Sequence, residues 1–181
     1  MTDKLADAIY YLVDKLSIIE SRTKLIKLLY LADSLAKKRL GRTITGVKYV
    51  YHYYGPYSHE IILKAIDMSA NGEITEVFDP VENRYIYRKG VKSRNLELNP
   101  KEVEILDEII ENFGKLNTRE IKNKVYETEE MKRSKPGDTV LEWCSGRTAM
   151  SFQIEEINKE YSCLLYTSDA ADELDGVDLG G

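Results

Sequence analysis

The sequence predicts an α+β domain that is predominantly α-helical, with a helical core and a small antiparallel β-hairpin or sheet. Apolar residues recur at helical spacing in several segments, and these segments begin or end at residues that favour helix termini. Two short segments rich in β-branched and aromatic residues flank a turn-forming loop. The chain has 181 residues, of which 43% are hydrophobic, and this size and apolar content suit one domain.

Two helices are predicted at the N-terminus. Apolar residues at helical spacing indicate the first over residues 3–16. Ser21 is a favourable N-cap for a second helix that runs to about Arg39, and Gly41 suits its C-terminal end. The second helix has a broad apolar face, so we expect it to be central and well covered.

The next segment, TITGVKYVYHYY, predicts a strand over residues 47–53, because β-branched and aromatic residues favour extended backbone. Gly55 and Pro56 are expected to end this strand. Pro56 suits the first position of a helix, where its missing N–H costs nothing, so a third helix is predicted from there to about Ala70.

A hairpin is predicted where EITEVF and RYIYRK flank DPVEN, and it pairs residues 73–78 with 84–89. Near the end of the chain, TVLEWC is expected to be short and extended, and a last helix is predicted over residues 151–161. No internal repeat and no linker divides these segments, so residues 1–162 are expected to form a single domain.

Two further helices are predicted between the hairpin and the extended segment. Asn99 as N-cap, Pro100 in the first turn and Glu102 at the third position open one of them, and Gly114 ends it. Thr118 is expected to cap the other. The short glycine-containing turn between them gives a helix-turn-helix pattern.

The segment from Cys163 onward, CLLYTSDAADELDGVDLGG, differs in composition from the rest of the chain. It resembles translated sequencing-adapter sequence, so residues 163–181 are predicted to be non-native; a disordered acidic tail is the alternative. Five acidic residues lie in this tail. Without them the chain has 26 acidic residues instead of 31, which equals its number of lysines and arginines, 26. A body of zero formal charge argues against strong, sequence-independent phosphate binding.

Several function classes find no support in the sequence. No apolar run is long enough to span a membrane, and the N-terminus reads as a helix, not a signal peptide. Cys144 and Cys163 form no disulfide or metal framework, so a cytoplasmic location is expected. His52 and His59 lack metal-ligand spacing. No nucleophile motif or phosphate loop is present, so we expect neither an enzyme nor a bound cofactor; an enzyme that uses either histidine remains a third hypothesis.

A DNA-binding regulator that controls its own operon is the main alternative function. The helix-turn-helix pattern lies in EVEILDEIIENFGKLNTREIKNKV, and its second helix carries cations that could contact phosphates: Arg119, Lys122 and Lys124. Glu120 and Glu127 dilute that charge, and two packed helices are common in proteins that do not bind DNA.

The most unusual stretch is KYVYHYYGPYSHE, residues 48–60, with five tyrosines and two histidines. In a strand, alternate residues point to opposite faces, so one row of rings can enter the core while the other reaches solvent. Tyrosine suits protein interfaces because it combines a large contact area, few rotatable bonds and a hydroxyl. The alternative that individual rings belong to the core stays open. Base stacking is a further alternative, although the strip offers only Lys48 as a fixed cation.

The run LIKLLYLADSLAKKRLGRTITGVKYVYHYYGPYSHEI resembles the Panacea domain, also called the SocA-like antitoxin domain. The matching motifs are a helix reading KLLYLAD, a Gly-Arg-x-Ile turn, an aromatic segment ending in Gly-Pro, and a helix; they lie at residues 27–33, 41–44, 49–56 and 57–68. LNPKEVEILDEIIENFGKLNTREI also fits a later family segment, so the resemblance covers most of residues 5–142. Many members carry Thr-His where this chain has Val125-Tyr126-Glu127, so no role of that histidine transfers.

The resemblance implies an antitoxin of a prokaryotic or phage toxin–antitoxin pair, which neutralises its toxin by direct binding and needs no catalytic site. The partner implied is a cognate toxin encoded by an adjacent gene, and one member type delivers its toxin to a protease. The resemblance leaves the stoichiometry and the oligomeric state open. On this interpretation, the expected partner-binding residues are Tyr51, Tyr53, Tyr54, Gly55, Pro56, Tyr57 and Arg42.

Overall fold

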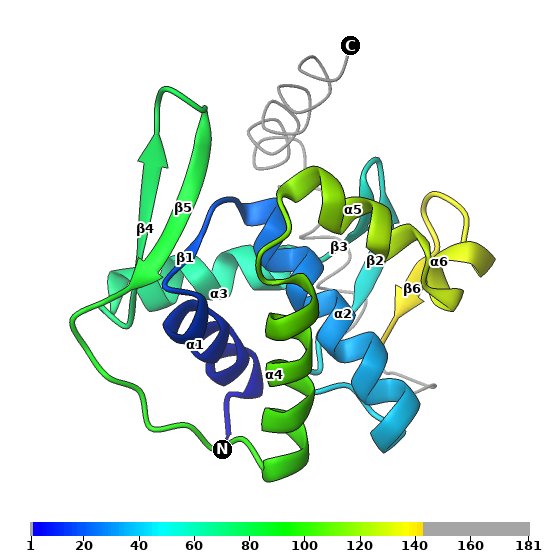
Figure 1. The fold of residues 1–181 in the computed structure, drawn as a ribbon, viewed down its shortest axis with the longest axis horizontal. Helices are drawn as coiled ribbons and strands as arrows, with labels where there is room; N and C mark the ends of the chain where they lie inside the picture. Colours follow the sequence, from blue (N-terminus) through cyan, green and yellow to red (C-terminus); the bar gives the residue numbers. More distant parts are fainter. Residues whose placement is uncertain (1, 143–181) are drawn as a thin grey trace.

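The computed structural model describes residues 2–142, and Figure 1 shows how their helices and strands are arranged. The helix expected over residues 151–161, the expected end of the domain at residue 162 and the tail over 163–181 lie outside the described residues. Within residues 2–142, six helices and two small antiparallel sheets make up the fold. This confirms the predicted fold class, α+β and predominantly α-helical.

The first two helices form as predicted. They are α1 (Lys4–Leu16) and α2 (Arg22–Leu40). The Ser21 hydroxyl caps α2 by accepting a hydrogen bond from the Lys24 N–H at 3.0 Å, and Gly41 ends the helix with a left-handed φ of 72°. Most side chains of α2 are buried, which confirms its predicted central position.

Four more helices follow: α3 (His59–Ala70), α4 (Pro100–Phe113), α5 (Thr118–Tyr126) and α6 (Glu129–Arg133). Helix α4 begins with the predicted capping box, in which the Asn99 side chain accepts the Glu102 N–H and the Glu102 carboxylate accepts the Asn99 N–H. Asn117 and Glu120 form a second capping box. Asn117 is therefore the N-cap of α5, and the prediction that Thr118 caps this helix is wrong by one residue. No helix within residues 2–142 is both long and apolar enough to cross a membrane.

Two three-stranded sheets lie on opposite sides of α2 (Figure 1). The first has the order β1-β5-β4, with β1 at Ile18–Ile19, β4 at Ile74–Asp79 and β5 at Arg84–Lys89. The second has the order β3-β2-β6, with β2 at Tyr49–His52, β3 at Gly55–Tyr57 and β6 at Thr139–Leu141. The predicted hairpin forms as β4–β5, but its first strand lies one residue later than predicted, since Ile74 pairs with Lys89 and Asp79 with Arg84.

The segment around Gly55-Pro56 differs from the prediction. Instead of opening a helix, Pro56 lies in β3, which folds back on β2 so that His52 pairs with Gly55 and Tyr51 with Pro56. Strand β3 is an edge strand, where proline is tolerated because its missing N–H removes no bond from the sheet interior. Helix α3 begins only after Ser58, so the strand predicted over 47–53 is in fact the first arm of a short hairpin.

The core joins α2 to the second sheet through buried aromatic rings. The rings of Tyr30 on α2 and Tyr49 on β2 meet edge to face, with centroids 5.3 Å apart and planes at 78°. Both side chains are fully buried. The contact fixes the start of β2 against the central helix.

Candidate functional site

A buried carboxylate holds the base of the β2–β3 hairpin. The oxygens of Asp33 on α2 accept hydrogen bonds from the N–H groups of Ile44 at 2.8 Å and Thr45 at 3.0 Å. They also accept from the hydroxyls of Thr45 at 2.5 Å and Tyr49 at 2.9 Å. Burial raises the pKa of the Asp33 carboxyl, while the bonds from Thr45, Tyr49 and Ile44 act to lower it. The chain that leads into β2 is thereby tied to α2.

The return strand β3 is held from two sides. The buried Lys27 ammonium donates to the Pro56 carbonyl at 3.0 Å. Gly55 adopts a φ of +96°, which is strained for any residue with a side chain, and a Cβ there would lie 3.6 Å from the Tyr126 ring and 3.7 Å from Lys27 Nζ. The backbone below the turn is therefore packed against α2 and α5.

The hairpin separates its expected partner-binding residues into an exposed turn and a buried base. Tyr53 lies in the turn between the strands and is 82% exposed. Tyr51 and Tyr54 are half-buried. The Tyr57 hydroxyl lies 3.4 Å from Nδ1 of His59 inside the protein. The buried residues of the base are Gly55, Pro56 and Tyr57.

Helix α5 lies beside these tyrosines. The Nζ atom of Lys122 is 5.2 Å from the centroid of the Tyr54 ring, which is cation–π geometry. The ring of Tyr126 is tilted against that of Tyr51 at a centroid distance of 6.3 Å. We call this surface the hairpin–α5 face; it comprises Tyr51, Tyr53, Tyr54, Arg119, Lys122 and Tyr126.

The cations expected to contact nucleic acid have different surroundings. Lys122 belongs to the aromatic cluster of the hairpin–α5 face. Lys124 lies 3.3 Å from the carboxylate of Glu127, one turn along the same helix. Arg119 is exposed in the first turn of α5. From the sequence alone, these cations belonged to the DNA-binding hypothesis and the tyrosines to the partner-binding hypothesis. In the structure, Lys122 and Tyr54 lie together.

Arg42 forms an ion pair with a residue at the start of α4. Its guanidinium lies 2.8 Å from Glu102 and also donates to the Thr43 carbonyl. The buried Glu102 carboxylate also binds the Lys4 ammonium at 2.7 Å. Burial acts to raise the pKa of Glu102, but hydrogen bonds from Lys4, Asn99 and Arg42 outweigh it, and the pKa lies below its ordinary value.

The two histidines serve as packing side chains of the hairpin region. The His52 ring stands edge to face against Tyr53 at 5.0 Å and also contacts the Tyr57 ring at 5.5 Å. Burial lowers the pKa of His52, and Lys27 adds to this effect. The pKa of His59 is likewise lowered by burial and then by Arg22. Among the described residues, no group of three or more His, Cys, Asp or Glu side chains could hold a metal ion.

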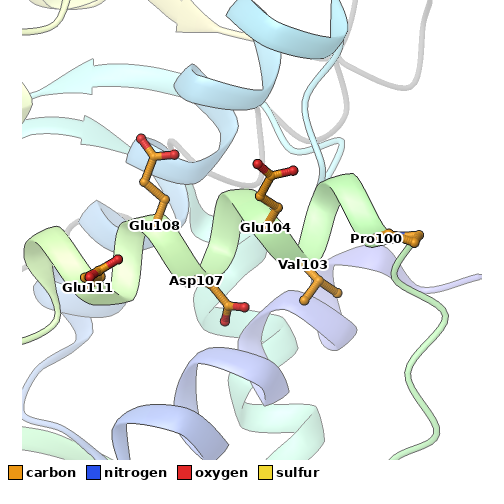
Figure 2. A pocket seen from close by; sticks show the side chains of 6 residues that line it. All are labelled: Pro100, Val103, Glu104, Asp107, Glu108 and Glu111. Carbon is orange, nitrogen blue, oxygen red and sulfur yellow. The ribbon is translucent and has the colours of Figure 1, made fainter.

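A second surface feature is an open hollow of about 580 Å³ along α4. Figure 2 shows the side chains that line it. Its acids have partners in part: Arg39 forms a bidentate pair with Glu108 at 2.7 and 3.0 Å, and Tyr11 donates to Asp107 at 2.6 Å. Burial and this bond raise the pKa of Tyr11 to about 12. All of the lining residues come from one helix: Pro100, Val103, Glu104, Asp107, Glu108 and Glu111. The hollow is therefore lined by one acidic helix surface, and Arg39 of α2 and Tyr11 of α1 bind two of its acids.

Sequence reasoning overlooked two residues that shape the hairpin–α5 face. Lys27 had no role in the sequence-based predictions beyond its place in the second helix, yet this lysine is buried beneath Pro56. Tyr126 entered only as a departure from the family pattern, yet its ring packs over Gly55. The position of Lys27 on a helix with a broad apolar face indicates burial only weakly. The contact between Tyr126 and Gly55 joins distant segments, so no local sequence pattern predicts it.

Comparison with known proteins identifies one relationship. The family model described as "Antitoxin SocA-like, Panacea domain" matches residues 25–130. The matched region begins in α2 and ends in α6, so it includes both hairpins and all of α5. No curated protein and no solved structure matches the chain.

Proposed function

Because the chain belongs to the family of SocA-like antitoxins with a Panacea domain, we propose that it neutralises a cognate toxin by direct protein–protein binding. The toxin is the product of an adjacent gene, and the complex forms in the cytoplasm. The binding surface that we propose is the hairpin–α5 face, because it presents aromatic side chains on a backbone that is held in place.

The observation that carries this proposal is the position of Tyr53. Its ring is 82% exposed, although the hairpin beneath it is anchored by Asp33, Lys27 and the packing of Tyr126 on Gly55. An aromatic side chain on a preorganised backbone gains contact area at a small cost in conformational entropy. Tyrosines in such positions are frequent hot spots of protein interfaces.

The buried residues of the hairpin support the surface from below. Gly55, Pro56 and Tyr57 offer little area to a partner, so we assign them the task of shaping the turn. Tyr51 and Tyr54 are half-buried, so part of each side chain remains accessible near Tyr53 in the sequence. We assign Arg42 a structural role, because its ion pair with Glu102 occupies its guanidinium.

The experiment is co-expression with the adjacent open reading frame, followed by binding of the purified proteins. The neighbour is expected to stop growth alone and to permit growth with this protein present. Tyr53→Ala is expected to weaken binding by about 2 kcal/mol, or about 30-fold, while the melting temperature stays unchanged. Val81→Ala is the matched control, since Val81 is 87% exposed on the other hairpin. A neighbour that remains toxic in the presence of this protein would refute the proposal.

Two forms of neutralisation are distinguished by the same purified components. If binding itself blocks the toxin, its activity falls in a mixture that contains no protease. If this protein delivers the toxin to a protease, activity persists in that mixture and the toxin disappears only in cells that contain the protease. We favour direct blocking of the toxin, because binding at the hairpin–α5 face requires no protease.

The regulator hypothesis gains a partial structural basis from α4 and α5, which are joined by the short turn after Phe113. Its cations are partly engaged, since Lys124 pairs with Glu127 and Lys122 lies over Tyr54. Duplex DNA that contains the operon's upstream region tests it directly. Binding with a steep salt dependence would support a regulator, and lack of binding at low salt would remove it.

A further inference from the structure

The ring of Tyr53 contacts a neighbour in its own hairpin. Tyr53 and Tyr54 form the turn between β2, which ends at His52, and β3, which begins at Gly55. The backbone of His52 is held in the sheet, because it pairs with Gly55 across the two strands. The imidazole ring of His52 stands edge to face against the Tyr53 ring, with centroids 5.0 Å apart and planes at 86°. His52 therefore contacts the one exposed side chain among the expected partner-binding residues.

The same imidazole also contacts the protein interior. Its ring centroid lies 5.5 Å from that of Tyr57 on β3, and the two planes are tilted by 44°. Tyr57 is buried, and its hydroxyl lies 3.4 Å from Nδ1 of His59, the buried first residue of α3. These contacts connect a buried ring of α3 to the exposed ring in the turn. His52 therefore links the interior to Tyr53.

Such a contact lowers the entropic cost of binding through Tyr53. An exposed tyrosine samples several side-chain rotamers, and ordering its ring in a complex costs free energy. A ring contact within the free protein orders the side chain beforehand, so the complex forms at a smaller cost. Edge-to-face pairs of aromatic rings also contribute an attraction beyond the area that they bury. Without the imidazole, we expect Tyr53 to keep its exposure and to lose its fixed orientation.

A positive charge on the imidazole would disturb this arrangement. Burial lowers the pKa of His52, and the Lys27 ammonium on α2 adds to this effect because it repels a protonated ring. Tyr53 in the turn and Tyr57 on β3 contact the imidazole, and neither supplies a carboxylate that could stabilise the charge. The imidazole is half-buried, so a partner that covers Tyr53 removes more water from it and disfavours the charge further. The complex therefore binds a proton on His52 less readily than the free protein does.

We infer that His52 is a positioning residue of the toxin-binding face: its neutral ring orients Tyr53, and its protonation in mild acid weakens the complex. The inference rests on the proposed function and adds two properties to the same face, a residue that acts through Tyr53 and an affinity that depends on pH. The affinity is highest above the pH range in which the imidazole takes up a proton from solvent, and it falls as the pH decreases through that range.

The first test measures the affinity for the purified product of the adjacent gene by titration calorimetry at pH 7.5. His52→Gln removes the ring and is expected to weaken binding about fivefold, the size of one aromatic pair. In the Tyr53→Ala background, the same substitution is expected to have almost no further effect, because no ring is left to orient. His59→Gln is the matched control, since it removes the imidazole that contacts Tyr57 instead of Tyr53, and it is expected to keep the wild-type affinity.

The second test repeats the titrations at pH 5.5 with His52→Phe, whose ring cannot take up a proton. This variant is expected to bind like the wild type at pH 7.5 and to lose less affinity than the wild type at pH 5.5. A pH effect that arises in the toxin is common to both proteins, so the difference between them reports on His52. Melting temperatures at both pH values verify that each variant is folded, and His52→Phe decides alone if His52→Gln does not fold.

Three results would overturn the inference. The first is equal affinities of His52→Gln and His59→Gln. The second is an undiminished effect of His52→Gln in the Tyr53→Ala background, which would mean that the imidazole does not act through Tyr53. The third is an equal loss of affinity at pH 5.5 in the wild type and in His52→Phe. Failure of the wild-type protein to bind the neighbour at either pH would instead refute the proposed function.

Discussion

The hairpins β2–β3 and β4–β5 both carry tyrosines, but their contacts with the helices extend over different lengths. In β4–β5, Arg22 stacks on the Tyr85 ring at 3.5 Å and pairs with Glu76. Beyond this anchor the hairpin stands clear of the helices, as Figure 1 shows. In β2–β3, contacts continue to the turn itself, where α5 covers Tyr54 and Gly55.

Exposure alone does not distinguish the turns of the two hairpins. Val81 and Tyr53 are 87% and 82% exposed, each at the turn of its hairpin. The edge of β4 also offers few N–H groups for pairing with another strand. The Ser69 hydroxyl accepts the outward Glu76 N–H, and Pro80, directly after β4, has no N–H. We therefore attribute partner binding to the hairpin whose backbone is held up to its turn.

The largest expected effect comes from removing the carboxylate below β2–β3. In Asp33→Asn, an NH₂ group replaces one of the two carboxylate oxygens. The buried donors that bind this oxygen, among the Ile44 N–H and the Thr45 and Tyr49 hydroxyls, lose their acceptor. We expect a loss of about 3 kcal/mol in the free energy of unfolding, measured in urea. Asp79→Asn is the comparison on the other hairpin, where an exposed turn tolerates either side chain. Similar losses for both variants would contradict the unequal anchoring.

The strained turn gives the next largest effect. Gly55→Ala forces a side chain to adopt a φ of +96° and is expected to cost about 1–2 kcal/mol. Gly41→Ala at the end of α2, with a φ of 72° and no atom near its Cβ, is expected to cost a similar amount. Of the two, only Gly55→Ala should reduce toxin affinity, which titration calorimetry would measure. Equal affinities of the two variants would mean that the turn geometry is irrelevant to binding.

Mild acid should weaken the β2–β3 side of the molecule. His52 and His59 have pKa values below their ordinary value of 6.5, so the unfolded chain binds protons more readily than the folded protein. Stability is therefore complete above pH 6.5 and falls as the pH decreases toward the lowered pKa values. Melting temperatures between pH 7.5 and 5.5 should change less for the variant His52→Gln with His59→Gln, and an unaltered pH dependence would exclude the histidines as its source.

The smallest effect is expected on the projecting half of β4–β5. Phe78→Ala removes a tilted ring contact with Tyr85, at a centroid distance of 5.1 Å, from a side chain that is 44% exposed. We expect a loss of about 0.5 kcal/mol in the free energy of unfolding and an unchanged affinity for the toxin. If Phe78→Ala weakened toxin binding as much as Tyr53→Ala, the functional distinction between the hairpins would fail.

The sequence predicted the features that have local causes. The capping box of Asn99 and Glu102 and the β4–β5 pairing follow from residues close together in the chain, and both form. Pro56 was assigned to a helix because proline suits a first helical turn and an edge strand equally well. The choice of the edge strand places Pro56 where Lys27 of α2 binds its carbonyl.

By itself, the sequence determined the fold class, the order of the helices α1 to α5, the β4–β5 hairpin and the family, because periodicity, caps and motif order are properties of neighbouring residues. The short helix α6 was not predicted. Only the tertiary structure decided which tyrosines reach solvent and that Lys122 and Tyr126 join them. The physical reason is that burial depends on what covers a side chain. Here the cover comes from α5, whose Lys122 lies 68 residues after Tyr54, and from α2, whose Lys27 lies 29 residues before Pro56.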